Sequence, residues 1–298
     1  MRQGIRQIWQ ACTYNFHTWR RNPRIWVVFG LGFVLCFLLT NKVVRFSQEY
    51  HSILQLFEPF IWTFGDTNSI LLASLLLVLL FSNMPFVTAA TPFYLARTTR
   101  LRWLLGQLLY IVMATGIYLL FILVCSSLLW AQQAYLPNFW SPAAAILGYS
   151  KAGTELQVPS MVKCLEMASP LSCMGMIFAL ILLYTLLCIF LMFVCNLRFG
   201  RFWGIFSVFA WSLYGFFLNP QIFVKILHIT DEHNLYVANV AAAWASPLNH
   251  ATFSMHSFGY ELLPTLGQSC LCFAGCLLLL WILGWRAVRR YNFGFSGG

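Results

Sequence analysis

The sequence predicts an all-α membrane protein that crosses the bilayer several times. Hydrophobic residues make up 60% of its 298 residues and charged residues only 9%, whereas soluble domains carry about 25% charged residues. The mean hydropathy is +0.74, so the chain could not cover a water-soluble globule of its size with polar surface. The formal charge of +10 reflects 8 acidic against 18 basic residues. It arises from scarce acids, and nucleic-acid binding is not indicated.

An amphipathic helix is expected before the first span, over residues 1–22. Its apolar positions recur at helical spacing: Ile5, Ile8, Trp9, Cys12, Phe16 and Trp19. Arginine, glutamine and asparagine occupy the other side, which is typical of a helix lying in the membrane interface on the anionic cytoplasmic leaflet. The alternative is a helix packed on another subunit.

Six mostly apolar stretches contain no Asp, Glu, Lys or Arg, and a bilayer-crossing helix needs about 20 such residues. We therefore predict spans over 25–40, 69–90, 103–130, 172–196, 202–218 and 262–285. Asn22 and Pro23 precede the first span, where Asn can cap a helix and Pro fits its first turn. The whole of 1–298 is expected to be one transmembrane domain, with a six-span bundle over 23–290 and a short tail over 291–298.

Lysine and arginine are distributed unequally between the two sides that these spans define. One side holds thirteen of the basic residues and no acid: Arg2, Arg6, Arg20, Arg21, Arg24, Arg97, Arg100, Arg102, Arg198, Arg201, Arg286, Arg289 and Arg290. The other side holds the remaining basic residues and every acid: Lys42, Arg45, Lys151, Lys163, Lys225, Glu49, Glu58, Asp66, Glu155, Glu166, Asp231, Glu232 and Glu261. Because basic residues near span ends stay in the cytoplasm, both termini are predicted to be cytoplasmic.

The linker between the second and third spans joins aromatic residues to three arginines. Its notable residues are Phe93, Tyr94, Arg97, Thr98, Thr99, Arg100, Arg102 and Trp103. One interpretation is an ordinary positive-inside loop. The other is a docking surface, since arginine and aromatic residues dominate the energetics of protein contacts.

Between the fifth and sixth spans, residues 236–244 form a small, apolar, charge-free stretch that is too short to cross the bilayer. It is expected to be a re-entrant or interfacial helix. The preceding Asp231-Glu232-His233 does not predict a metal site, because adjacent residues seldom converge on one ion and no HExxH motif accompanies them.

The sequence lacks several motifs that would supply chemistry of its own. It contains neither a GxxxxGK phosphate loop nor a GxSxG nucleophile elbow. The predicted spans also lack the ionisable residues that proton- and ion-coupled carriers use as coupling sites. No catalytic residue, metal or cofactor of this chain is therefore predicted, and any active transport must be energised by another protein.

Uncharged polar residues do occur in the second and fifth spans. If these two spans line a translocation path, the residues that face it are expected to be Asn83, Thr88, Ser207, Trp211 and Tyr214. The alternative for each is ordinary helix packing, in which small and hydroxyl residues are common.

Four features, taken in their order along the chain, resemble the membrane (permease) subunits of type-2 ATP-binding-cassette (ABC) transporters. They are the stretches Arg20–Ile25, Arg102–Gln107, Ser246–Ser254 and Gly284–Tyr291, at the first span, the linker, the last loop and the end of the last span. The resemblance covers essentially the whole chain. The order and spacing of these four stretches carry the resemblance.

The resemblance implies a subunit of an ATP-driven exporter in the cell membrane. It implies a second permease subunit, identical or different, and separate ABC ATPase subunits that bind ATP and Mg. It also implies that the stretch near 97–103 is the coupling element, that 236–244 belongs to a re-entrant hairpin, and that the second and fifth spans flank the path. The competing hypothesis is a non-transporting membrane scaffold, or a membrane-embedded enzyme that uses outward histidines and acids.

Overall fold

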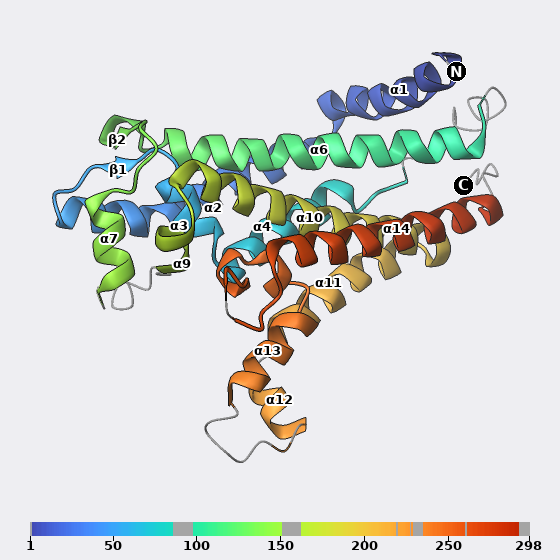
Figure 1. Cartoon of the computed structure of the whole chain (residues 1–298). Coiled ribbons are helices and arrows are strands. Elements are labelled where there is room, and N and C mark those ends of the chain that lie inside the picture. The colour runs from blue at the N-terminus through green and yellow to red at the C-terminus, as the bar shows by residue number, and fades with distance from the viewer. Residues whose placement is uncertain are drawn as a thin grey trace.

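A computed structural model shows a bundle of long helices and describes residues 2–85, 98–150, 162–218, 220–226, 228, 235–259 and 261–291 (Figure 1). Within these described ranges, four helices are long and apolar enough to cross a membrane: α2 (Pro23–Glu49), α6 (Arg100–Leu128), α10 (Pro170–Phe199) and α14 (Leu266–Arg290). Two bent pairs, α3 (Glu58–Phe64) with α4 (Thr67–Phe81) and α11 (Arg201–Phe217) with α12 (Pro220–Ile226), raise the number to six if each pair is one span. The predicted helical membrane fold is thus confirmed at this level.

Helix α10 is the centre of the bundle. It contacts α3, α4, α6, α11 and α14, and 72% of its most apolar window is buried, against 17% for α14. Neither α10 nor α14 contains an acidic residue, so acidic residues do not explain this difference in burial. The difference follows from the position of each helix in the bundle. The exposed side of α14 remains available to lipid or to another subunit.

Helix α1 (Arg2–His17) and the 3-10 turn that follows it (Thr18–Arg21) lie along the start of α6. Asn15 Nδ2 donates to Gln107 Oε1 at 2.9 Å, and Trp19 Nε1 donates to Tyr110 Oη at 2.8 Å. Trp9 of α1 is 51% exposed. The predicted amphipathic helix therefore packs on its own chain and leaves apolar side chains such as Ile5 and Trp9 exposed.

The first long helix begins where the sequence predicts and ends later. Asn22 Oδ1 accepts from Arg24 N at 3.1 Å, and Pro23 opens α2. The helix continues to Glu49 rather than ending near residue 40, so Lys42 and Arg45 lie on its last turns. At 1.5 Å per residue it is about 40 Å long, which exceeds a hydrocarbon core of about 30 Å.

The second predicted span differs most from the structure. A bend of 88° separates α3 from α4. Asp66 starts α4 by accepting from Asn68 N at 3.1 Å. Helix α4 ends at Phe81, well before the predicted residue 90, and residues 86–90 lie outside the described part of the chain. Glu58, expected in a loop, is fully buried on α3.

Short elements cover the end of the bundle opposite α1. A parallel pair of two-residue strands joins β1 (Leu54–Gln55) to β2 (Ala134–Tyr135). The elements beside and after it are a 3-10 turn (Ala131–Gln133), α7 (Pro142–Tyr149) and α9 (Val162–Met167). Ser141 caps α7, since its Oγ accepts from Ala144 N at 3.0 Å.

The predicted re-entrant stretch is helical and becomes α13 (Leu235–Ala245), which packs against α12. Helix α12 turns away from α11 by 76°, and α12 and α13 project from the bundle in Figure 1. Two 3-10 turns, η4 (Asn249–Ala251) and η5 (Phe253–Met255), then lead to α14. Thr265 and Gln268 form a capping box there, so α14 begins four residues after the predicted 262.

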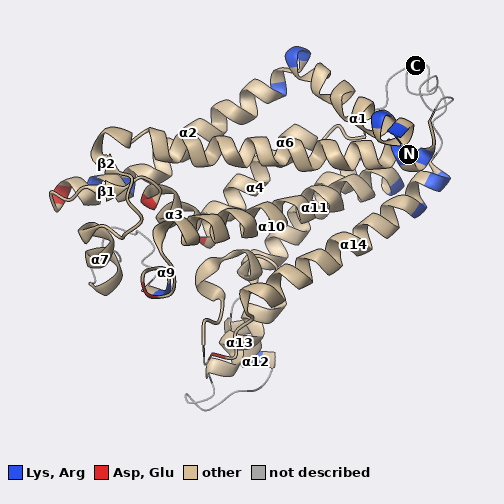
Figure 2. Cartoon of the chain, turned by 45° about the horizontal axis from the view of Figure 1, so that its top comes forward, with Lys and Arg blue, Asp and Glu red and all other residues tan. Residues whose placement is uncertain are grey.

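Charge is segregated between the two ends of the bundle. Figure 2 shows most basic residues near the first turns of α1 and α6 and the last turns of α14, and the acidic residues around α3, β1 and α9. The exceptions are Lys42 and Arg45, near the end of α2, and Lys163 of α9, which lie among the acidic residues. We call the first region the basic end and the second the acidic end.

Candidate functional site

The described part of the predicted coupling linker ties three helices together at the basic end. Thr98 Oγ1 and Arg102 Nη1 both donate to Gln7 Oε1 of α1, at 3.3 and 2.8 Å. Arg100 Nη1 donates to the carbonyl oxygens of Val288, at 3.2 Å, and of Arg289. Since cations are favourable at a helix C-terminus, Arg100 stabilises the last turn of α14.

Individual linker residues have different surroundings. Thr99 is exposed and caps α6, with its Oγ1 accepting from Arg102 N at 3.4 Å. Trp103 was predicted as an aromatic anchor of the linker surface, and the structure buries it to 3% exposure. Trp103 is the first residue of the apolar part of α6, and it packs into the bundle instead of lying on the linker surface. Phe93, Tyr94 and Arg97 lie outside the described residues.

A close approach fixes α1 beside the linker. A Cβ placed on Gly106 would lie 2.5 Å from Ala11 Cβ and 3.0 Å from the Ile8 carbonyl oxygen. Only a residue without a side chain permits this crossing. A displacement of the linker would therefore move α1 together with α6.

The predicted path residues fall in two places. Ser207, Trp211 and Tyr214 recur at helical spacing along α11, whereas Asn83 follows the end of α4 and Thr88 lies outside the described residues. Ser207 Oγ donates to the Gly204 carbonyl of its own helix at 2.7 Å. Tyr214 Oη donates at 3.4 Å to the carbonyl oxygen of Ala245, so it fastens α11 to the end of α13.

The turn that contains Asn83 is held by its neighbours. Arg24 Nη1 donates to Ser82 Oγ at 2.7 Å, which joins the start of α2 to this turn. Asn196 Nδ2 of α10 donates to the Met84 carbonyl oxygen at 2.7 Å. Asn83 itself is half-buried. This turn is therefore anchored on two spans at once.

Buried polar atoms without a partner occur at several places in the described bundle, among them the contact between α10 and α11. Within the described part of the chain, Trp211 Nε1, Ser212 Oγ and Tyr184 Oη are buried without a hydrogen-bond partner. Such groups are rare in folded proteins and call for an explanation. Trp211 is predicted from the sequence, whereas Tyr184 is not, because its burial follows from the packing of α10 on its neighbours.

A buried polar cluster lies at the acidic end, where the sequence analysis expected only outward histidines. Ser269, in the first turn of α14, lies 2.7 Å by its Oγ from His250 Nδ1 and 2.9 Å from His256 Nε2. The second ring nitrogens face carbonyl oxygens of Trp244, at 3.0 Å, and Phe253, at 3.2 Å. The cluster pins the loop between α13 and α14 onto the bundle.

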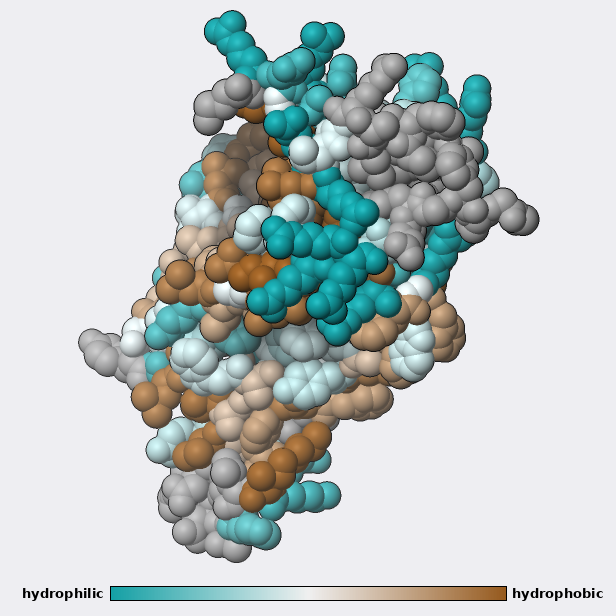
Figure 3. Space-filling model, turned by 90° about the vertical axis from the view of Figure 1, so that its right-hand side faces the viewer, coloured by the Kyte–Doolittle hydropathy of each residue, from teal (hydrophilic) through white to brown (hydrophobic). Residues whose placement is uncertain are grey.

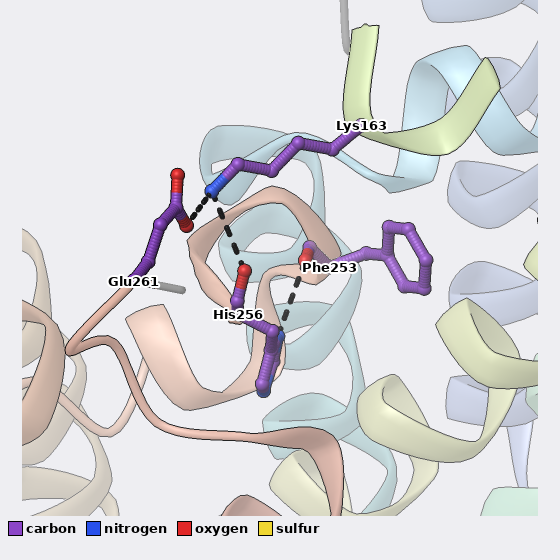
Figure 4. A network of polar contacts seen from close by, with 4 residues as sticks. All are labelled: Lys163, Phe253, His256 and Glu261. Atoms are coloured by element: carbon purple, nitrogen blue, oxygen red, sulfur yellow. Dashed lines mark hydrogen bonds and ion pairs between the residues drawn. The ribbon is translucent and has the colours of Figure 1, made fainter. Parts of the chain in front are cut away.

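The surroundings of His256 are drawn in Figure 4, where Lys163 of α9 points to the His256 carbonyl oxygen, 3.4 Å away, and forms an ion pair with Glu261. Ser269 and His256 have no exposed surface and His250 is 6% exposed. A serine paired with histidine resembles a hydrolytic site, but a substrate could not reach this serine. No group of three metal-binding side chains occurs among the described residues either. The geometry favours a structural role.

The cluster should loosen in acid. Burial lowers the pKa of both imidazoles below their ordinary value of 6.5, and the neighbouring His250 and Lys163 lower that of His256 further. The unfolded loop would thus bind more protons than the packed loop, so packing is strongest above pH 6.5 and weakens as the pH falls below it. Glu261 is the acidic group that offsets Lys163 nearby.

We expect hydrogen exchange of 249–258 to be clearly faster at pH 5 than at pH 7.5 after correction for intrinsic rates. Combined His250→Asn and His256→Asn changes should remove most of this dependence. His17→Asn, at an exposed position, should leave it unchanged. Equal protection at both pH values in the unmodified protein would contradict the prediction.

The geometry described so far is that of a helical bundle with four to six helices that could cross a membrane. Comparison of the chain with known protein families, curated proteins and solved structures finds no match.

Proposed function

We propose that the chain is the permease subunit of an ATP-driven exporter of the type-2 ABC kind. The observation that carries the proposal is the junction at the basic end, where Arg100, Arg102 and Thr98 connect α6 to α14 and α1. The sequence contains no ATP-binding motif, and the apolar middles of α2, α6, α10 and α14 carry no Asp, Glu, Lys or Arg. Glu58 and Asp66, in the bent second span, bond to Ser141 and to the first turn of α4. The driving force for transport would therefore come through a protein contact. This junction would transmit a push on the linker to three helices at once.

In this proposal each bent helix pair counts as one span, which gives six spans in a multi-pass protein of the cell membrane. The basic end faces the cytoplasm, as the positive-inside rule requires, and so do both termini. Helix α13 belongs to a re-entrant hairpin on the outer side. The bends of 88° and 76° fall in the second and fifth spans, and transporters commonly form substrate sites at discontinuous helices.

The path would run along α11 and the turn after α4. Trp211 and Tyr214 offer aromatic area to a large amphipathic cargo. Tyr214 and Phe217 of α11 are 49% and 60% exposed. A second permease subunit covers such a face and closes the path.

The exposed residue Thr99 provides the test of docking. Thr99→Trp adds bulk to the linker surface, while Thr99→Ala removes the same helix cap without adding bulk. Loss of an N-cap lowers helix stability by about 1 kcal/mol, and this loss is the same in both variants. We expect Thr99→Trp to lower, about tenfold or more, the Mg-ATPase activity that co-purifies with the tagged chain from its native membranes.

Thr99→Ala should retain most of that activity, and both variants should insert in equal amounts. A chain that co-purifies with no phosphate-loop ATPase, or that turns over a substrate without one, would contradict the proposed function. An ATPase retained equally by both variants would move the docking surface away from this linker.

A further inference from the structure

A cavity lies at the basic end between the last turns of α10 and α14. It has a volume of about 880 Å³, and its polar walls are formed by Arg198 of α10 and by Arg286, Arg289 and Arg290 of α14. Figure 3 looks at this end of the molecule and shows hydrophilic side chains gathered beside an apolar surface. Four guanidinium groups around one cavity make it a strongly cationic site.

The positive charge of this cavity is not balanced by the described carboxylates. The single ion pair found among the described residues joins Lys163 to Glu261 at the acidic end. The Arg289 guanidinium lies 4.5 Å from the Trp285 ring centre, so this contact orients it without neutralising it. Arg286 and Arg290 are one helical turn apart and present two planar donors to the same ligand.

An apolar groove continues from the cavity along α14. A second hollow of about 460 Å³ is lined by Gly275, Leu278, Leu279 and Ile282, and it shares Leu283 and Arg286 with the cationic cavity. From Arg286 to Gly275 the helix rises about 16 Å. This length is close to half of a hydrocarbon core of about 30 Å, which is the depth of one leaflet.

We propose that this composite site binds an anionic phospholipid of the leaflet at the basic end. The phosphate lies among Arg198, Arg286 and Arg290, which form charge-assisted hydrogen bonds to its oxygens. One acyl chain lies in the groove toward Gly275. A free phosphate would explain the arginines but not the apolar groove that begins at the same residue.

Binding can be measured with the whole purified chain and a fluorescent phosphatidylglycerol. We expect phosphatidylcholine to compete at least about tenfold more weakly than phosphatidylglycerol, and millimolar inorganic phosphate not to compete. Arg286→Gln combined with Arg290→Gln should weaken phosphatidylglycerol binding about tenfold or more. Lys42→Gln with Arg45→Gln removes the same charge at exposed positions of the acidic end, away from the cavity, and should leave binding unchanged.

The groove has its own variant. A Cβ at position 275 meets no atom within 4 Å, so Gly275→Phe fills the groove without disturbing the bundle and should weaken lipid binding. If the arginine variant does not fold, lipid binding by Gly275→Phe tests the proposed site in its place. Undiminished binding by the folded arginine variant would overturn the site. Competition by inorganic phosphate, with no effect of Gly275→Phe, would instead identify a free-phosphate site and overturn the lipid assignment. Neither measurement involves an ATPase, so it is independent of the proposed function.

Discussion

Replacing Gly204 with valine is expected to force α11 away from α10 and to lower the stability of the bundle severely. A Cβ on Gly204 would lie 1.7 Å from Asn196 Oδ1 and 2.8 Å from the Met192 carbonyl oxygen. Asn196 could yield only by giving up its hydrogen bond to the Met84 carbonyl oxygen, 2.7 Å long. Overpacking typically costs about 1–3 kcal/mol and occasionally more, and here a buried hydrogen bond is lost as well.

The effect should appear as a lower midpoint of thermal unfolding in detergent and as a smaller yield of monodisperse protein. Gly116→Val is the matched control, because Gly116 lies in the middle of α6 and a Cβ there meets no atom within 4 Å. Similar midpoints for the two variants would mean that α10 and α11 do not cross at Gly204 as described.

Glu58→Leu is expected to release α7 from the acidic end. The Glu58 carboxyl group is fully buried, and its two oxygens accept from Ser141 N at 2.7 Å and from Ser141 Oγ at 2.6 Å. Leucine would leave both Ser141 donors buried without an acceptor, at a cost of about 1–3 kcal/mol for each. Because Ser141 also caps α7, the loss should spread to that helix.

Glu58→Gln is the matched control, since its amide oxygen keeps one acceptor and the Ser141 hydroxyl can turn to accept from the amide N–H. Hydrogen exchange of 141–149 should be much faster in Glu58→Leu than in Glu58→Gln. Equal exchange in the two variants would show that the Glu58 contact does not hold α7.

The long helices could be predicted from the sequence because their signals are local. Helix α11 begins and ends within one residue of the predicted span 202–218, since Arg201 and the turn after Phe217 bound its apolar run. The break between α3 and α4 could not be predicted, because Asp66 was interpreted as a loop residue although it caps a helix. The burial of Glu58 depends on Ser141, which lies 83 positions away in the sequence.

The candidate sites show the same division. The sequence singled out Thr98, Arg100 and Arg102 by composition, but it could not show that their partners are Gln7 and the carbonyl oxygens that end α14. His250 and His256 meet on Ser269 only because the chain turns back through η4 and η5 before α14. A capping box at Thr265 was the one local sign that a helix begins just before this serine.

The confinement of charge to helix ends has an electrical consequence. Moving one elementary charge through a potential of 100 mV changes its energy by about 2.3 kcal/mol. The apolar middles of α4, α6, α10, α11 and α14 contain no Asp, Glu, Lys or Arg, so rearrangements of these helices carry almost no charge of the protein across the membrane field. Movements confined to these five helices would therefore add little gating charge. A voltage dependence of the activity would report either the charged residues of α2 and α3 or the charge of what passes through the protein.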